Sequence, residues 1–348
     1  MVMAPAEFLR TPLKIGDLSI SPPLVLAPMA ENTSYPFRMI CKRYGAALTV
    51  TEMVTTHPFA QLSRQSRKII ERGPGEYPLA VQICGNEPDL MEKCVDNAVL
   101  LGYEIIDLNL GCPVRRMVSR DYGGGLGRYP ERVEQLLKIM VSRSRVPVTV
   151  KIRKGFAATD DTAVELARIA EACGVAMITV HGRTVSQMYS GRADWDVIRR
   201  VKEAVKVPVV GNGDVVDGKS AQAMLAQTGC DGIMIGRGAI GRPWVFRDVI
   251  SWFSGATEPF EPPSDEMIAV VREHFEMLAL YAGESKAALL MRKYLCSYSR
   301  GMPFSHEFRR RCLNLRSRVE FDMVLAMLPL SKPAYEGREK NVSSSVEG

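Results

Sequence analysis

Short apolar runs recur along the chain at intervals that suit strands alternating with helices. Their starts are 24, 31, 26, 43, 29, 32 and 23 residues apart, and each interval has room for a strand, a crossover helix and two loops. The intervening stretches have helical spacing, as in 160–173, where Ala163, Val164, Ala167 and Ala170 recur every three or four residues. The eight predicted strands are Leu24–Ala27, Leu48–Thr51, Leu79–Ile83, Ile105–Leu108, Val148–Lys151, Met177–Val180, Val209–Gly211 and Gly232–Ile235.

Continuous apolar strands separated by amphipathic helices indicate a parallel sheet whose outer face is covered. Eight such units predict a closed (β/α)8 TIM barrel of the α/β class. An open doubly wound sheet is the alternative, and the number of units favours the barrel. Before the first unit, Leu13–Ile20 predicts a hairpin around Gly16-Asp17 that caps the barrel floor.

The pattern changes after Arg242-Pro243, where strands cease and three helices are predicted at Ser264–Leu280, Lys286–Tyr298 and Phe308–Val319. The chain is therefore predicted to have three parts. These are a catalytic barrel at 1–255, an all-helical C-terminal domain at 256–330 and a polar, Ser-rich disordered tail at 331–348.

One connection departs from the barrel rhythm. Residues 109–129 have no helical period and contain Gly123, Gly124, Gly125 and Gly127. A long irregular loop in a compact domain is usually functional. It follows the fourth strand at its C-terminal end, where barrel enzymes have their active sites, so we expect a lid.

Composition narrows the function classes. Of 348 residues, 46% are hydrophobic and 24% charged, the ordinary globular balance. No run of about 18 apolar residues predicts a membrane span, and the N-terminus has no signal-peptide pattern, so we expect a cytoplasmic protein. The eight cysteines form no CxxC pair and the four histidines form no HxH or HxxxH pair, which argues against a metal site.

The positive charge is concentrated near the C-terminus. The chain has 45 Lys and Arg against 39 Asp and Glu, a net charge of +6. Residues 284–320 contain nine of these cations and three acids, so this segment alone carries 9 − 3 = +6. A basic segment on a neutral body suggests an anionic partner, and a solvated helix face is the alternative.

Polar residues follow the apolar strands at their C-terminal ends and should converge on one face. The residues at these ends are Pro28, Met29, Ala30, Gln82, Asn109, Cys112, Lys151, His181, Asn212, Gly213, Asp214, Gly236 and Arg237. The glycine turns after strands seven and eight suit a phosphate, which barrels often bind there. Gly236, Gly238 and Gly241 also match GxGxxG, but the acid twenty residues on, Glu258, lies in no strand, which argues against a dinucleotide fold.

Three of these residues could take part in chemistry. Lys151 ends an apolar strand, where an unpaired cation is costly to bury; it could be a Schiff-base nucleophile or a donor to an anionic ring. His181 could face a ligand or be structural. The Cys112 thiol, with an ordinary pKa of about 8.5, is largely protonated at neutral pH and could donate a proton; a nucleophilic role would need a depressed pKa.

Motifs in these positions resemble those of the tRNA-dihydrouridine synthases, most closely the bacterial B-type branch. The resemblance spans roughly residues 13–320. It rests on APMAENTSYPFR (27–38), VQICG (81–85), DLNLGCP (107–113), VTVKIRKG (148–155), ITVHGRT (178–184), GNGD (211–214) and MIGRGAIGRPW (234–244).

The resemblance implies an FMN-dependent enzyme in which NADPH reduces the flavin and reduced FMN passes a hydride from N5 to C6 of a uracil in tRNA. Cys112 would protonate C5 and Asn109 would address the uracil edge. The implied FMN contacts are Pro28, Met29 and Ala30 along the flavin, Gln82 and Lys151 at its pyrimidine ring, His181 near it, and Asn212, Gly213, Asp214, Gly236 and Arg237 at the ribityl and phosphate. The basic helical segment would bind tRNA, and a monomer is the family expectation.

The chain departs from the family pattern at three places. Glu31 stands where the family usually has Gly, Ser34 where it usually has Asp, and the lid reads Gly124-Gly125-Leu126-Gly127 in place of a small residue followed by Ala-x-Leu. Two other functions are therefore kept open. One is a small-molecule pyrimidine flavin oxidoreductase of the dihydroorotate dehydrogenase type, and the other is a non-catalytic tRNA-binding module.

Overall fold

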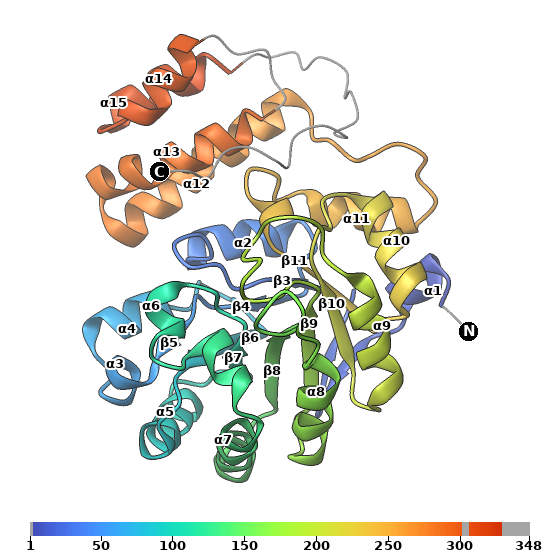
Figure 1. The fold of residues 1–348 in the computed structure, drawn as a ribbon. Coiled ribbons are helices and arrows are strands. Elements are labelled where there is room, and N and C mark those ends of the chain that lie inside the picture. The colour runs from blue at the N-terminus through green and yellow to red at the C-terminus, as the bar shows by residue number, and fades with distance from the viewer. Residues whose placement is uncertain (1–2, 301–305, 329–348) are drawn as a thin grey trace.

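The computed structural model describes residues 3–300 and 306–328, and its centre is a closed parallel barrel (Figure 1). The strand order is β4-β3-β11-β10-β9-β8-β7-β6, and pairing of β4 with β6 closes the ring. Each barrel strand overlaps one of the eight predicted strands, so the predicted (β/α)8 fold is confirmed. The barrel strands are β3 (Leu24–Leu26), β4 (Leu48–Val50), β6 (Leu79–Cys84), β7 (Ile105–Leu110), β8 (Val148–Arg153), β9 (Met177–His181), β10 (Val209–Asn212) and β11 (Gly232–Ile235).

Helices surround the barrel and bury its outer apolar face (Figure 1). A two-residue strand, β5 (Val54–Thr55), extends the sheet beside β6. The helices outside the barrel are α1 (Pro5–Arg10), α2 (Tyr35–Arg43), α3 (Thr56–Ala60), α4 (Arg64–Ile69), α5 (Pro88–Leu100), α7 (Pro130–Arg143), α8 (Ala163–Ala172), α9 (Trp195–Ala204), α10 (Gly218–Thr228) and α11 (Val245–Phe253). None of the helices in the part of the chain described is long and apolar enough to cross a membrane.

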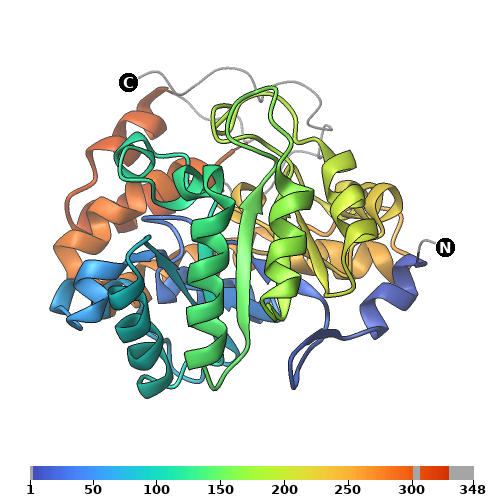
Figure 2. The same ribbon diagram turned by 60° about the horizontal axis from the view of Figure 1, so that its bottom comes forward.

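The predicted hairpin is present as β1 (Leu13–Ile15) and β2 (Leu18–Ile20), and it closes one end of the barrel (Figure 2). Its buried side chains pack with inward residues of the barrel strands, including Val25, Val210 and Met234, in a small apolar cluster separate from the main core. The floor of the barrel interior is therefore dry and apolar, and the polar inward residues lie beyond it, toward the C-terminal ends of the strands.

The predicted lid is present between β7 and α7, but the expectation that it lacks helical structure is wrong. It contains α6 (Arg115–Val118) and a 3-10 helix, η1 (Gly123–Arg128). Leu126 and the three consecutive glycines are buried. The segment is thus folded back onto the barrel mouth, and its conformation depends on that packing.

The C-terminal helices lie against α2 on one side of the barrel mouth (Figure 1). They are α12 (Ser264–Ala282), α13 (Glu284–Tyr298), α14 (His306–Asn314) and α15 (Arg318–Ala326). The third predicted helix, Phe308–Val319, is wrong because α14 ends at Asn314, and a capping box between Ser317 and Glu320 starts a new helix at Arg318. Division into domains at 255 stays a prediction, and the predicted disordered tail at 331–348 lies outside the described residues.

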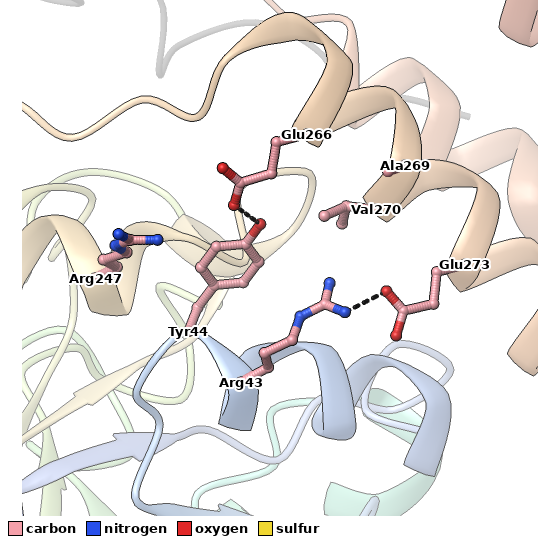
Figure 3. Close-up of a pocket in the computed structure, with 7 residues that line it drawn as sticks. All are labelled: Arg43, Tyr44, Arg247, Glu266, Ala269, Val270 and Glu273. Atoms are coloured by element: carbon pink, nitrogen blue, oxygen red, sulfur yellow. Dashed lines mark hydrogen bonds and ion pairs between the residues drawn. The ribbon is translucent and has the colours of Figure 1, made fainter.

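A hollow of about 290 Å³ separates α12 from α2 and α11, and polar contacts bridge it (Figure 3). Tyr44 Oη donates a hydrogen bond to Glu266 Oε1 at 2.8 Å, and Arg43 pairs with Glu273. Arg247 points into the same hollow (Figure 3). The helical segment is therefore held to the barrel by specific charged contacts as well as by apolar packing.

Candidate functional site

Buried polar side chains fill the open half of the barrel and bond to one another. Gln82 Nε2 donates to Asp107 Oδ2 at 2.7 Å, and Thr149 Oγ1 donates to the other carboxylate oxygen at 2.6 Å. Asn109 Nδ2 donates to Gln82 Oε1 at 2.7 Å. Burial raises the pKa of Asp107 above its ordinary value. This network fixes the Gln82 amide, which keeps one N–H and one oxygen lone pair for a ligand.

Lys151 lies inside the barrel on β8, and its ammonium group has a neutral partner. Nζ donates to Asn212 Oδ1 at 3.0 Å, and Asn212 Nδ2 donates to the carbonyl oxygen of Met234 at 2.8 Å. Burial first, and then the charge of Arg153, lower the pKa of Lys151 to about 7. The pairing of Lys151 with Asn212, two strands away, confirms neither a Schiff-base nor a donor role, but it places both residues at the centre of the mouth.

Asn109 holds the backbone that carries Cys112. Its Oδ1 accepts hydrogen bonds from the N–H of Gly111 at 3.0 Å and of Cys112 at 2.9 Å. Burial raises the pKa of the Cys112 thiol, and the side chain is 9% exposed. The thiol therefore stays protonated at neutral pH at the edge of the mouth. Both polar ends of the Asn109 side chain are already bonded, so its predicted contact with a uracil stays a prediction.

The glycines of η1 let the lid pack directly on Cys112. At Gly123, where φ is +55°, an added Cβ would lie 2.7 Å from Cys112 Cβ and 3.2 Å from Asn109 Oδ1. Gly124 donates its N–H to the carbonyl oxygen of Cys112 at 3.1 Å. No side chain fits at Gly123 without moving the cysteine, so the glycine-rich sequence positions the thiol.

The first βα loop carries Pro28, Met29 and Ala30 at the barrel mouth. Thr33 Oγ1 accepts from the N–H of Met29 at 2.9 Å and closes this turn. Two residues of α13 grip the loop: Lys293 Nζ donates to the carbonyl oxygen of Glu31, and Tyr294 Oη donates to that of Asn32 at 2.7 Å. The C-terminal helices therefore form part of the wall of the mouth.

Glu31, one of the departures from the family pattern, adopts the left-handed conformation with φ +62°. Its N–H donates to Glu52 Oε2 at 2.6 Å, and burial raises the pKa of Glu52. A glycine would adopt this φ without strain. Glu31 is exposed.

The two turns predicted to hold a phosphate lie next to each other. An added Cβ at Gly238 would lie 2.4 Å from the carbonyl oxygen of Val215, so the turn after β11 packs on the turn after β10. The Asp214 carboxylate faces protein groups: it pairs with the fully buried Arg183 at 2.8 Å and accepts the N–H of Ala193 at 2.7 Å. Arg237 reaches over the Tyr189 ring at 5.2 Å.

His181 ends β9 beside this cationic group. Its Nε2 lies 3.5 Å from Arg183 Nη1. Burial, followed by the charges of Lys151, Arg153 and Arg183, lowers the pKa of His181 below its ordinary value, so the imidazole is neutral. An added Cβ at Gly213 would lie 3.1 Å from the His181 ring. His181 and the β10 turn therefore share one wall of the mouth.

The structure adds residues that the sequence interpretation missed. Arg153 donates to the carbonyl oxygens of Gly111 at 2.7 Å and Thr184 at 2.8 Å, and so joins the loops after β7 and β9. Arg183 and Asp107 were also missed. Strand alternation is the signal that could have found two of them, because Arg153 follows Lys151 by two positions and Asp107 precedes Asn109 by two.

Two features fit a bound anionic cofactor. Thr179 Oγ1, beside Lys151 in the strand register, is buried with no hydrogen-bond partner among the described residues. Gly236 faces space, because an added Cβ would meet only Ala27 and Met29, at 3.5 and 3.7 Å. Within 3–300 and 306–328, no group of three or more His, Cys, Asp or Glu could hold a metal ion. The mouth thus offers a partly buried lysine, free polar groups and a protonated thiol.

Comparisons with known proteins agree with this geometry. The family model described as dihydrouridine synthase matches residues 25–331. The "Probable tRNA-dihydrouridine synthase" of Rickettsia conorii is 41% identical over 298 residues, which cover 85% of this chain and 90% of that protein. The "tRNA-dihydrouridine synthase B" of Vibrio parahaemolyticus is 36% identical over 333 residues, 95% of this chain and 100% of that protein. The "tRNA-dihydrouridine synthase B" of Pasteurella multocida is 38% identical over 298 residues, which cover 86% of this chain and 90% of that protein. The chain therefore belongs to the dihydrouridine synthase family, as its motifs predicted, and is an enzyme of that class.

Proposed function

We propose that this protein reduces specific uridines of tRNA to 5,6-dihydrouridine, with FMN as its resident cofactor and NADPH as the electron donor. Membership of the family and the names of its relatives support the reaction. The observation that carries it is the placement of a protonated thiol, Cys112, at the same barrel mouth as the buried cation Lys151. Reduction of a uracil double bond needs both a hydride and a proton, and this mouth offers a source for the proton.

The residues present fit FMN. Lys151 would face the electron-rich edge of the flavin pyrimidine ring, where a positive charge stabilises the reduced, anionic form. Gln82 has a free N–H and lone pair for the same edge, and Thr179 has an unused hydroxyl. Pro28, Met29 and Ala30 would pass along the ring system, with His181 near it. When bound and reduced by NADPH, FMN supplies the hydride for C6 of the uracil.

The phosphate of FMN would lie at the adjoining turns after β10 and β11. Asn212, Gly213 and Gly236 would contribute backbone or amide groups there, and Arg237 a charge. Because the Asp214 carboxylate is paired with Arg183, we infer that Asp214 shapes the turn and keeps Arg183 oriented, and that only its backbone faces the phosphate.

Cys112 would deliver the proton to C5 of the uracil. A buried thiol with a raised pKa keeps its proton until a carbanion-like C5 develops, and it then transfers that proton from Sγ. Asn109 and Gly123 fix where Sγ lies. Asn109 is proposed to contact the uracil edge through the N–H that in this structure makes only a long contact of 3.8 Å with Met53 Sδ.

The basic C-terminal segment would bind tRNA. Lys286, Arg309 and Arg316 form no ion pair with the described residues, whereas Arg310 and Arg311 pair with Glu307. Unpaired cations attract phosphates most strongly, and such binding weakens steeply with salt. A protein that acts on tRNA as a monomer in the cytoplasm is the arrangement we propose.

Enzyme assay with matched substrates tests this function. The purified protein should release FMN, and with NADPH it should form dihydrouridine in tRNA from a strain that lacks the protein's gene. Cys112→Ala should keep the flavin and lose most turnover, while Cys173→Ala, at the end of α8 outside the barrel, should behave as wild type. Reduction of free uracil or orotate in preference to tRNA would instead favour a small-molecule oxidoreductase. Tight tRNA binding without NADPH consumption would indicate a non-catalytic module.

A further inference from the structure

A second hollow, of about 410 Å³, lies between the lid and the helices that follow β5. It has no part in the reaction proposed for the barrel mouth. Its volume is within the range of small-ligand sites. Its walls come from β5, α3 and α4 on one side and from α6 and the residues after it on the other. The lining residues are Met53, Val54, Thr55, His57, Pro58, Gln65, Ser66, Ile69, Arg116, Arg120 and Tyr122.

The hollow adjoins the proposed catalytic group through two of its own wall residues. Met53 Sδ lies 3.8 Å from Nδ2 of Asn109, the residue that holds the Cys112 backbone. Tyr122 directly precedes Gly123, which packs on Cys112 Cβ. A group bound in the hollow would therefore contact Met53 and Tyr122, which adjoin the two residues that hold Cys112 in place, Asn109 and Gly123.

The rim of the hollow carries two arginines that are accessible to an anionic ligand. Arg116 and Arg120 are exposed, and neither forms an ion pair with any residue in 3–300 or 306–328. By contrast, Arg128 at the far end of the same lid and Arg132 at the start of α7 both pair with Asp121. The backbone under Arg120 is fixed, because its carbonyl oxygen accepts a hydrogen bond from Asn86 Nδ2 at 3.0 Å. The two guanidinium groups thus lie on an ordered segment and can each pair with an anionic ligand.

The inner wall is mostly apolar, with Met53, Val54 and Ile69 beside the hydroxyl of Ser66. Two acids near the lining residues are occupied. Glu87 accepts hydrogen bonds from the hydroxyls of Tyr122 and Thr56 and lies 3.6 Å from His57 Nε2. Asp121 pairs with Arg128. None of the lining residues is an acid, so a negative charge is favoured at the rim beside Arg116 and Arg120. An apolar wall with a cationic rim matches a nucleotide, whose base has flat faces that pack on apolar side chains and whose phosphate is anionic.

We propose that this hollow binds a nucleotide next to the target uridine, with the linking phosphodiester at Arg116 and Arg120 and the sugar and base against the apolar wall. The proposal rests on the proposed function. A uridine must leave its stack to reach the barrel mouth, which also unstacks its neighbours. A subsite that holds one neighbour would fix the backbone while the uridine enters, and would contribute to the choice of which uridine is reduced.

The test combines arginine variants of the protein with tRNA in which one backbone linkage is uncharged. The variants are Arg116→Gln, Arg120→Gln and, as a matched control, Arg168→Gln, which removes an exposed arginine from α8. Loss of a phosphate contact should weaken tRNA binding several-fold and lower the slope of log Kd against log salt by about 1 for each arginine. The control should leave both unchanged. Binding by fluorescence anisotropy and dihydrouridine formation are measured on the same transcripts.

The decisive arm uses tRNA with one methylphosphonate, placed in turn at the linkage on either side of the target uridine. At one of the two positions the neutral linkage should weaken wild-type binding and abolish the difference between wild type and Arg116→Gln. If both arginine variants match Arg168→Gln, or keep their full effect on both modified RNAs, the subsite is excluded. A wild-type protein that forms no dihydrouridine would refute the proposed function separately, because the binding arm does not depend on turnover.

Discussion

Lys151 Nζ and Asn212 Oδ1 meet 3.0 Å apart across the barrel interior, although their strands β8 and β10 are separated by β9. The pair joins a cation to a neutral amide. Since a buried charge is costly unless it is matched by an opposite charge, burial lowers the pKa of Lys151 to about 7. The barrel mouth therefore contains a lysine whose ammonium group gains an oppositely charged partner only when an anion binds.

The first prediction concerns the stability of flavin-free protein with Lys151→Met. In the unfolded chain the lysine pKa is about 10.4, so between pH 7 and that value the unfolded state binds more protons, and wild-type stability rises with pH. Below pH 7 the cost of the buried charge is fully present. The unfolded and folded pKa values differ by about 3.4, so at 1.36 kcal/mol for each pKa unit Lys151→Met should be more stable than wild type at pH 6 by up to about 5 kcal/mol.

Urea unfolding at pH 6, 8 and 10 measures this difference, which should shrink toward pH 10. Lys219→Met, an exposed lysine on α10, serves as the control and should show no such trend. A wild type as stable as Lys151→Met at pH 6 would contradict the prediction. With FMN bound the order should reverse, because the ligand then matches the charge.

The second prediction separates two cysteines by their reactivity. Burial raises the pKa of Cys112 above its ordinary value, whereas a hydrogen bond from the Cys312 thiol lowers the pKa of Cys296 below it. Only the thiolate is alkylated. Iodoacetamide should therefore label Cys296 at a lower pH than Cys112, and Cys112 should stay unlabelled at pH 7, as measured by peptide mass spectrometry. Labelling of Cys112 at pH 7 would argue for a nucleophile and against a proton donor.

The third prediction uses a matched pair of glycines in η1. Gly123→Ala adds a Cβ 2.7 Å from Cys112 Cβ at a position with φ +55°, where other residues are strained, so the cysteine must move. At Gly127 the nearest atom to an added Cβ is 3.6 Å away and no positive φ is required. Gly123→Ala should lower kcat at least tenfold while tRNA binding stays within twofold, and Gly127→Ala should match wild type. Equal kcat values for the two variants would show that the lid does not position the thiol.

The sequence could predict the barrel and the mouth because both depend on local pattern. Eight apolar runs at a regular spacing define the strands, and the residues that end them, from Gln82 to Arg237, converge in any barrel. What failed depends on tertiary packing. The lid is helical because Gly123 folds onto Cys112, and no periodicity in residues 109–129 encodes that contact. Arg183 lies beyond the end of β9, so strand alternation does not reach it.

The C-terminal segment shows a second limit. Charge counting treated its nine cations as equivalent, but the fold assigns them different partners. Arg318 pairs with Glu276 and Glu284, and Lys293 bonds to the first βα loop. The break between α14 and α15 was readable in principle, since Ser317 and Glu320 have capping-box spacing. Which cations remain free for RNA required the structure.

The fourth prediction follows from these partners. Arg309→Gln and Arg316→Gln remove cations without ion pairs in the described segment, and should weaken tRNA binding and lower its salt slope by about 1 each, with no change in Tm. Arg318→Gln removes a cation held by two carboxylates and packed over the Phe275 ring at 4.9 Å. It should lower Tm by a few degrees and leave the salt slope nearly unchanged. If Arg309→Gln and Arg318→Gln changed the salt dependence of tRNA binding equally, the separation into RNA-binding and fold-stabilising arginines would be refuted.

The last prediction concerns the buried ion pair under the first βα loop. Arg38 Nε lies 2.7 Å from Glu76 Oε1 with both side chains fully buried, and Arg38 Nη1 donates to the carbonyl oxygen of Thr33 at 2.7 Å. Burial raises the pKa of Glu76, but the bonds from Arg38 outweigh it and leave the pKa below its ordinary value. Glu76→Gln strands the arginine charge, which should cost about 3–5 kcal/mol at pH 7.

The pKa of Glu76 is lower in the folded protein than in the unfolded chain. The ionised Glu76 therefore adds to the free energy of unfolding above the unfolded pKa of about 4.3, and this stabilisation disappears as pH falls through the folded pKa. The stability gap between wild type and Glu76→Gln should therefore be widest at neutral pH and narrow below about pH 4. Denaturant unfolding at pH 3, 5.5 and 7 measures it. Glu134→Gln, which breaks an exposed pair with Lys138 on α7, is the control and should change stability little. A Glu76→Gln protein as stable as Glu134→Gln at pH 7 would show that the pair does not hold the loop.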